Sequence, residues 1–208
     1  MMKNNKGKRL ITWGLLLIAA ALSLTGYNLY DGYRAERSAK EAVSSLEVLT
    51  PVETALGPEN DPTGKEAEIP DYILNPNMEM PAEHINGMDY IGILRVPALD
   101  LELPVISEWS YPRLKIAPCR YTGSAYTGDL IIAAHNYSAH FGRLHALHEG
   151  DTATFTDMDG NVFTYQMAER ETLQPASVDE MESGDWDLTL FTCTVGGQSR
   201  ITLRFVLN

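Results

Sequence analysis

The longest apolar pattern lies near the N-terminus, where residues 10–30 include no charged side chain. A helix of this length matches the roughly 30 Å hydrocarbon layer of a bilayer. Basic residues precede the run and Asp31 follows it, a bias that places the N-terminus in the cytoplasm and the remaining chain outside the cell. We therefore predict a cytoplasmic segment over 1–9 and a single transmembrane anchor over 10–30. A cleaved signal peptide is the alternative, although the run is long for one and no cleavage-site pattern follows it.

Between residues 31 and 85 the pattern becomes polar and acidic. Residues 31–49 are rich in Ala, Glu, Ser and Arg and are compatible with a continuation of the membrane helix. Residues 50–83 are rich in Pro and acidic side chains and have no sustained period, which is typical of a linker. We predict an extracellular stalk over 31–85 that holds the next domain away from the membrane. Packing of this segment on the domain, or over its active site, is the alternative.

From residue 86 to residue 208, short apolar or alternating runs separated by turn residues predict a domain of β-strands. The predicted strands cover residues 90–96, 101–106, 130–134, 152–156, 162–167, 188–193 and 201–207. Asp159-Gly160 predicts a hairpin turn between two of them, and residues 138–147 have room for one or two helical turns. Many short strands in so small a domain indicate an antiparallel or mixed barrel or sandwich.

Charge and cysteine content exclude several classes of function. The formal net charge is -12, and basic runs are rare after the first ten residues, which argues against a nucleic-acid partner. Only two cysteines occur, Cys119 and Cys193; such a pair often forms a disulfide outside the cell, but the motif around Cys193 favours a free nucleophile. His140, His145 and His148 lack a carboxylate at matched spacing, so we expect neither a metal site nor a cofactor.

Three residues at strand ends suggest acyl-transfer chemistry. A predicted strand ends at Cys193, and a short Gly-containing turn leads to Arg200 in the next strand, so an antiparallel hairpin places both at the same end. A third apolar strand is followed by His135. A histidine can activate a thiol and protonate a leaving amine, and an arginine offers fixed donors to an oxyanion. Arg204 is a second candidate because it shares the strand face of Arg200, but Arg200 lies nearer the turn.

These segments resemble the catalytic motifs of sortases. The resemblance rests on Thr-Leu-Phe-Thr-Cys ending at Cys193, on the following strand with its arginine, and on the apolar strand ending Ala-His-Asn. The chain order and the N-terminal anchor are also similar, although Ala134 stands where the family often has Gly. Over about residues 88–207 the resemblance implies a mainly β fold, the sortase-like eight-stranded β-barrel with short helices. It implies His135 as acid/base, Cys193 as nucleophile and Arg200 as the clamp for oxyanion and substrate.

The resemblance also implies a reaction and its partners. A sortase cleaves a C-terminal LPxTG-like sorting signal of a surface protein or pilin through a thioester, and an amine of a cell-wall precursor or pilin lysine accepts the acyl group. The stalk has no Asp-Pro-aromatic lid, which slightly favours protein anchoring over pilus polymerisation. Trp109, Tyr111 and Tyr121 either line a groove for the sorting peptide or pack in the core.

Two other functions are compatible with parts of the pattern. Another extracellular cysteine peptidase is one, but papain-like enzymes place Cys before His, and the Ser/Thr-His-Gly-Cys motif of L,D-transpeptidases is missing. A non-catalytic, membrane-tethered β-domain that binds wall components is the other, and it requires the Cys-His-Arg set to be a coincidence.

Overall fold

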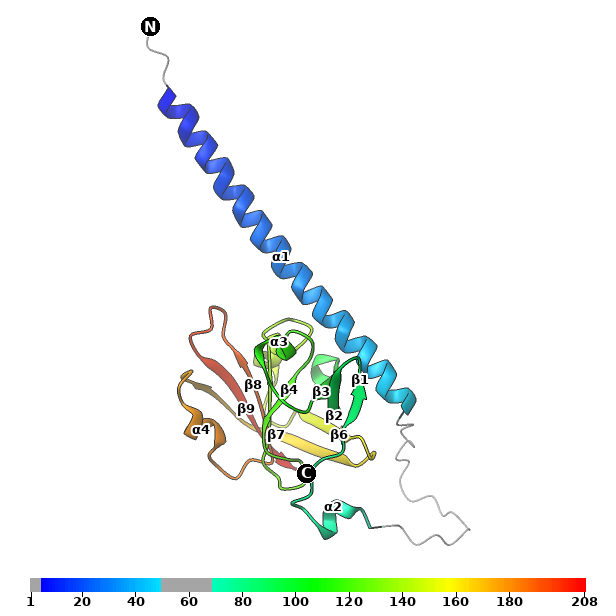
Figure 1. Cartoon of the computed structure of the whole chain (residues 1–208). Coiled ribbons are helices and arrows are strands. Elements are labelled where there is room, and N and C mark those ends of the chain that lie inside the picture. Colours follow the sequence, from blue (N-terminus) through cyan, green and yellow to red (C-terminus); the bar gives the residue numbers. More distant parts are fainter. Residues whose placement is uncertain (1–4, 50–68) are drawn as a thin grey trace.

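A single long helix, α1 (Asn5–Leu49), leads from the N-terminal end of the chain to the side of a β-barrel (Figure 1). The computed structural model describes residues 5–49 and 69–208. With 45 residues, α1 is about 67 Å long at 1.5 Å per residue. It includes a segment long and apolar enough to cross a membrane, and this segment is not buried in the protein. The helix therefore continues without a break from the predicted anchor into the predicted stalk.

The C-terminal half of α1 packs against the barrel. Its buried apolar residues recur every three or four positions and so lie on one face; they are Ala35, Ala39, Ala42, Val43 and Leu46. Ala39 belongs to the main core of the barrel. The end of α1 thus lies against the domain, one of the arrangements that the sequence left open. The Pro-rich part of the predicted stalk, residues 50–68, lies outside the described residues.

The barrel consists of short strands joined by turns and single helical turns. The strands are β1 (Glu83–Ile85), β2 (Met88–Val96), β3 (Leu101–Ile106), β4 (Cys119–Thr122), β5 (Leu130–Ala134), β6 (Thr152–Asp157), β7 (Val162–Leu173), β8 (Leu188–Cys193) and β9 (Arg200–Leu207). The helical segments are α2 (Asp71–Leu74), η1 (Pro97–Leu99), α3 (Tyr111–Leu114), η2 (Phe141–Ala146) and α4 (Val178–Glu182). Each strand predicted from the pattern is present, and β1 and β4 are additional.

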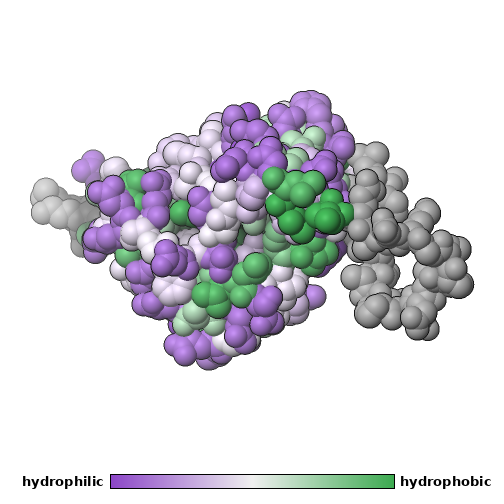
Figure 2. All heavy atoms as spheres, turned by 90° about the horizontal axis from the view of Figure 1, so that it is seen from below, coloured by the Kyte–Doolittle hydropathy of each residue, from purple (hydrophilic) through white to green (hydrophobic). Residues whose placement is uncertain are grey.

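Strand pairing closes the sheet on itself. The order is β1-β2-β3-β4-β5-β8-β9-β7-β6, and β6 pairs again with β2. β1 pairs only with the beginning of β2, so the other strands form the predicted eight-stranded barrel. Most pairs are antiparallel, but β3 and β4, and β5 and β8, are parallel. The interior is filled by residues with no exposed surface, among them Leu94, Leu130, Ile132, Leu190, Leu203 and Phe205. The outer surface seen from below is mixed, with apolar side chains gathered in patches among polar ones (Figure 2).

Arg204 of β9 fastens α4 to the barrel wall. Its side chain is only 2 % exposed. Its guanidinium donates to Oε1 of Glu171 on β7 at 2.5 Å and to Oγ1 of Thr189 on β8 at 2.9 Å. It also donates to the carbonyls of Glu180 and Met181 in α4, both at 2.7 Å. One buried cation therefore ties three strands to the short helix that follows β7.

A buried histidine lies in the loop between β5 and η2. His140 has no exposed surface, and neither ring nitrogen has a hydrogen-bond partner among residues 5–49 and 69–208. Burial, with a smaller contribution from nearby His135, lowers the pKa of His140 to about 4, while the Ala35 carbonyl of α1 opposes the shift. The native state therefore holds this ring neutral at pH values where an unfolded chain would protonate it.

Replacement of Arg204 tests its role as a fastener. Arg204→Met leaves the Glu171 carboxylate and two carbonyls without their donor, so we expect the free energy of unfolding to fall by about 3 kcal/mol. The measurement is urea denaturation of the full chain in detergent. Arg95→Met is the control, because Arg95 pairs with Glu102 and Glu47 nearer the surface and should cost less than about 1 kcal/mol. Equal losses in the two variants would contradict the assignment.

His140 makes stability depend on pH. Between its usual pKa of 6.5 and the lowered value of about 4, the unfolded chain binds a proton that the native chain does not, so stability falls by about 1.4 kcal/mol for each unit that the pH drops. His140→Phe removes this dependence. Between pH 7 and pH 5, the parent should therefore lose about 2 kcal/mol relative to the variant in urea denaturation.

His148→Phe at the exposed surface is the matched control for this experiment, and it should leave the pH dependence of unfolding as in the parent chain. A His140→Phe variant whose stability falls with pH as steeply as that of the parent would show that other groups carry the dependence.

Candidate active site

The ends of three neighbouring strands bring the predicted residues to one rim of the barrel. Along the parallel pair β5 and β8, the last matched residues are Ala134 and Thr192. His135 and Cys193 each follow this pair by one residue, and neighbouring strands lie about 4.8 Å apart. Across the antiparallel pair β8 and β9, Cys193 stands opposite Arg200. His135, Cys193 and Arg200 all line one pocket, which has a volume of about 210 Å³.

A buried side-chain hydrogen bond strengthens the β5–β8 pairing beside the pocket. Thr192 Oγ1 donates to the carbonyl oxygen of Ala134 at 2.8 Å, and Thr192 is 2 % exposed. Thr192 directly precedes Cys193, and Ala134 directly precedes His135. The bond therefore limits relative movement of the thiol and the imidazole.

One wall of the pocket is aromatic. Trp109, Tyr111 and Tyr121 line it together with Phe191, and the rings of Trp109 and Tyr121, and of Tyr121 and Phe191, lie 5.7 Å and 5.4 Å apart. Trp109 and Tyr111 therefore line the pocket, and Tyr121 both lines it and packs against the core. A role for this wall in binding the sorting peptide stays a prediction. Phe191 was missed, although strand alternation puts it on the same face as Cys193.

A second part of the pocket lining comes from the segment between β7 and β8. Gln174, Pro175, Ser177, Val178 and Met181 line the pocket on this side. Met181 is also one of the residues whose carbonyl Arg204 binds. The hydrogen bonds of Arg204 thus hold this part of the pocket lining in place. No motif in the sequence marked residues 174–181 as part of the site.

The environment of His135 favours the neutral form of its ring. Burial lowers its pKa, and Lys115 adds to the effect, whereas Asp31 of α1 opposes it. Its Nε2 is buried and has no hydrogen-bond partner within the described parts of the chain. A neutral imidazole can accept a proton from a thiol or an amine. The ring is therefore suited to act first as a base.

The two arginine candidates differ in what their donors bind. Within the part of the chain that the structure describes, Arg200 forms no ion pair, and its guanidinium makes only long contacts of 3.5 Å and 3.4 Å to the carbonyls of Gly197 and Ser199. Arg204 does not line the pocket, and its donors are taken by Glu171, Thr189 and α4. Arg200 is thus the arginine whose donors are available to a ligand.

The two cysteines have separate environments. Both are free thiols. Cys119 is buried in β4 opposite Ala133, and burial raises its pKa to about 12, so it stays protonated. Cys193 is partly exposed at the pocket. Among residues 5–49 and 69–208, no group of three or more His, Cys, Asp or Glu side chains is placed to hold a metal ion.

Comparisons with known proteins agree with this fold. A family model described as the sortase domain matches residues 94–208. Sortase C1 from Streptococcus agalactiae superposes with a TM-score of 0.54 and 24 % identity, covering 65 % of this chain and 74 % of that one. Sortase C-3 from Streptococcus pneumoniae superposes with a TM-score of 0.54 and 20 % identity, covering 88 % of this chain and 89 % of that one. A sortase D5 transpeptidase from Clostridium perfringens superposes with a TM-score of 0.52 and 22 % identity, covering 61 % of this chain and 82 % of that one.

At these identities the structural likeness establishes the fold alone. The curated proteins contain no match to the sequence. The family model, however, extends over more than half of the chain and includes all three strand ends that meet at the pocket. The chain therefore belongs to the sortase family of cysteine transpeptidases.

Proposed function

We propose that this sortase cleaves an LPxTG-like sorting signal through a thioester on Cys193 and transfers the acyl group to an amine. The observation that carries the proposal is the shared pocket, which Cys193, Arg200 and His135 line from three adjoining strand ends. A thiol, an imidazole and an unpaired guanidinium are the groups that acyl transfer needs.

The first half of the reaction forms the thioester. His135 accepts the thiol proton of Cys193, and the thiolate attacks the carbonyl carbon of the signal's threonine. Arg200 donates hydrogen bonds to the oxyanion that develops. When the carbon–nitrogen bond breaks, the departing glycine amine takes the proton from the imidazolium of His135. The acyl group is then held on sulfur.

The second half transfers the acyl group. The acceptor amine attacks the thioester carbonyl, Arg200 again binds the oxyanion, and His135 takes the proton that the amine loses. The carbon–sulfur bond then breaks, which releases the new amide, and the sulfur takes the proton from His135, so that both side chains return to their starting states. The acceptor belongs to a cell-wall precursor or to a pilin lysine. The aromatic wall of the pocket offers an apolar surface to the leucine and proline of the signal.

The proposed location of the protein in the cell membrane rests on helix α1. The apolar segment of the helix anchors the protein in a membrane, and the basic residues before it keep the N-terminus in the cytoplasm. On this proposal residues 1–9 are cytoplasmic and residues 10–30 span the membrane. Residues 31–85 form the extracellular stalk that connects this anchor to the catalytic domain over residues 86–208. The partners are then surface proteins or pilins that cross the same membrane.

Substitutions at the pocket test the proposal. The full chain in detergent is incubated with a sorting peptide and candidate amines, and mass spectrometry follows cleavage, the acyl-enzyme and the transfer product. Cys193→Ala should abolish all three, and His135→Asn should lower the rate about 10³-fold or more. Arg200→Lys should lower it about 10²-fold, because an ammonium cannot reproduce the donor geometry of a guanidinium.

Cys119→Ala is the control, since this thiol lies away from the pocket, and it should transfer the acyl group at nearly the parental rate. Transfer that persists in Cys193→Ala, or that is lost equally in Cys119→Ala, would refute the assignment of the nucleophile. Release of a free acid with every amine tested would indicate a peptidase instead of a transpeptidase.

A further inference from the structure

Helix α1 touches the loop that carries His135. The hydroxyl of Tyr137, two residues after His135, donates a hydrogen bond to Oδ2 of Asp31 on α1 at 2.5 Å. Asp31 is only 8 % exposed, although it is a carboxylate on a helix that extends far beyond the domain. Arg34 binds its other oxygen, Oδ1, at 3.0 Å. A buried, doubly bonded carboxylate at this point indicates a specific contact between the helix and the loop.

A second contact lies one helical turn further along α1. Ala35 has no exposed surface, and residues four apart lie on the same helix face. The Ala35 carbonyl lies close enough to the buried ring of His140 to affect its pKa. Two successive turns of α1 therefore meet the two ends of the segment from Tyr137 to His140.

Tyr137 is the residue through which this contact reaches His135. The aromatic ring of Tyr137 packs between two histidines, with its centroid 5.0 Å from that of His135 and 5.5 Å from that of His140. The Tyr137 carbonyl accepts hydrogen bonds from the backbone N–H groups of His140 and Gly142, both at 2.9 Å. The loop thus holds the backbone of Tyr137, while Asp31 holds the end of its side chain.

His135 has no other visible orienting group. Its Nε2 has no hydrogen-bond partner among the described residues, whereas a catalytic base usually relies on a third group to fix its ring. The ring of Tyr137, with its centroid 5.0 Å from that of His135, is placed to limit the rotation of this ring.

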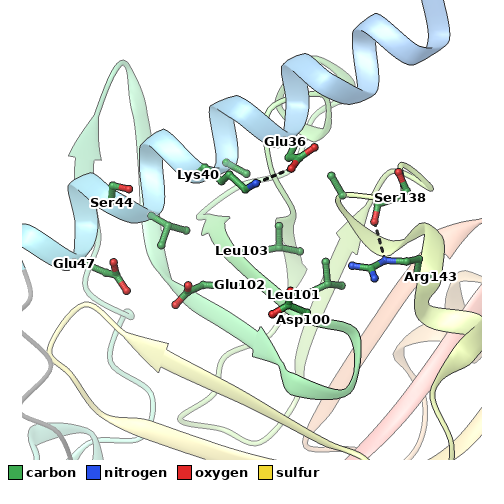
Figure 3. A pocket seen from close by; sticks show the side chains of 13 residues that line it. Glu36, Lys40, Ser44, Glu47, Asp100, Leu101, Glu102, Leu103, Ser138 and Arg143 are labelled. Atoms are coloured by element: carbon green, nitrogen blue, oxygen red, sulfur yellow. Dashed lines mark hydrogen bonds and ion pairs between the residues drawn. The ribbon is translucent and has the colours of Figure 1, made fainter.

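Beside the buried face of α1, a cavity lies between the helix and the barrel. This cavity of about 750 Å³ separates the helix from β3 and the start of η2, and the Glu36–Lys40 ion pair, at 2.6 Å, lies along it (Figure 3). Glu36 is therefore an α1 carboxylate whose partner is on its own helix, which makes it a control for Asp31.

We propose that Tyr137 and Asp31 are positioning residues for His135, so that α1 forms part of the active site. The inference rests on the role of His135 given under the proposed function. Asp31 directly follows the uncharged run of residues 10–30. The same residue therefore marks the end of the anchor and holds the base in place.

The charges around His135 allow position and electrostatics to be tested separately. Burial lowers the pKa of His135, Lys115 lowers it further, and Asp31 raises it. The other titratable groups around it are Tyr137 and His140 in the loop and Tyr111, Tyr121, Cys193 and Arg200 in the pocket. Tyr137→Phe removes the hydrogen bond but keeps the Asp31 carboxylate. Asp31→Asn removes the charge but keeps an oxygen that can accept the bond.

The experiment measures kcat and KM for acyl transfer between pH 5 and pH 9 with the full chain in detergent. Tyr137→Phe should lower kcat about tenfold with KM changed less than about twofold, because the base is misplaced while the peptide wall is intact. Its pH profile should keep the parental midpoints. Asp31→Asn should move the limb that His135 controls to lower pH, because the loss of a nearby negative charge lowers the pKa of His135 further.

Two variants on α1 serve as controls and should leave both kcat and the profile unchanged. Tyr33→Phe removes the hydroxyl of an exposed tyrosine, and Glu36→Gln neutralises a carboxylate on the same helix whose ion pair is with Lys40 of α1. Thermal unfolding of each variant is followed in parallel. A lower melting temperature with parental kcat and profile would mean a purely structural contact and would overturn the inference, as would a parental kcat in Tyr137→Phe.

The experiments distinguish failure of the proposed transpeptidase function from failure of the positioning role of Tyr137 and Asp31. If the parent transfers no acyl group, or if Cys193→Ala remains active, the proposed function falls. If Cys193→Ala and His135→Asn are inactive while Tyr137→Phe and Asp31→Asn behave as the parent, only the positioning role falls.

Discussion

Backbone hydrogen bonding among β5, β8 and β9 fixes the positions of the three candidate side chains, His135, Cys193 and Arg200. The last parallel pair, Ala134 and Thr192, puts the next residue of each strand at the rim, and the β8–β9 register adds Arg200 opposite Cys193. A slip of one residue would turn every side chain of a strand to the other face. Such a slip would expose core residues such as Ile132 and Leu190, which have no exposed surface. The packing of the barrel interior therefore protects the geometry of the site.

The strand register fixes backbone positions, but it leaves side chains and loops to be held by other means. Arg204 binds two carbonyls of α4, a helix that contributes to the pocket lining. Asp31 binds Tyr137, whose ring packs on His135. Both contacts use a charged group that is largely removed from water and has several hydrogen-bond partners, and such contacts are costly to disturb because a partner left behind is unpaired. The rigidity of the site thus has three sources: the barrel core, a buried arginine and the long helix.

The sequence predicted features that depend on neighbouring residues, such as strands and a hairpin. It did not predict contacts between residues far apart in the chain. The β8–β9 hairpin spans few residues, so apolar runs and a Gly-containing turn were enough to place Cys193 beside Arg200. The strands found by their patterns are five residues or more, whereas β1 and β4, with three and four residues, are too short to show a period. Closure of the barrel through β2 and β6 and the Asp31–Tyr137 bond, which joins residues 106 positions apart, depend on the complete fold. The acidic residue after the anchor was visible in the sequence, but it was interpreted only as part of a solvated stalk.

The choice between Arg200 and Arg204 shows how burial separates a structural cation from one available for binding. Strand alternation places both on the same face of β9, so residue spacing alone cannot distinguish them. A buried arginine needs acceptors for its N–H donors. Arg204, whose side chain is 2 % exposed, donates to four acceptors. Those acceptors would have to be given up before Arg204 could bind a substrate oxygen. Arg200 stands at the pocket with long carbonyl contacts only, so an oxyanion can take its donors without breaking a strong bond. Of two similar side chains on one strand, the one with unsatisfied donors is the one that can contribute to a transition state.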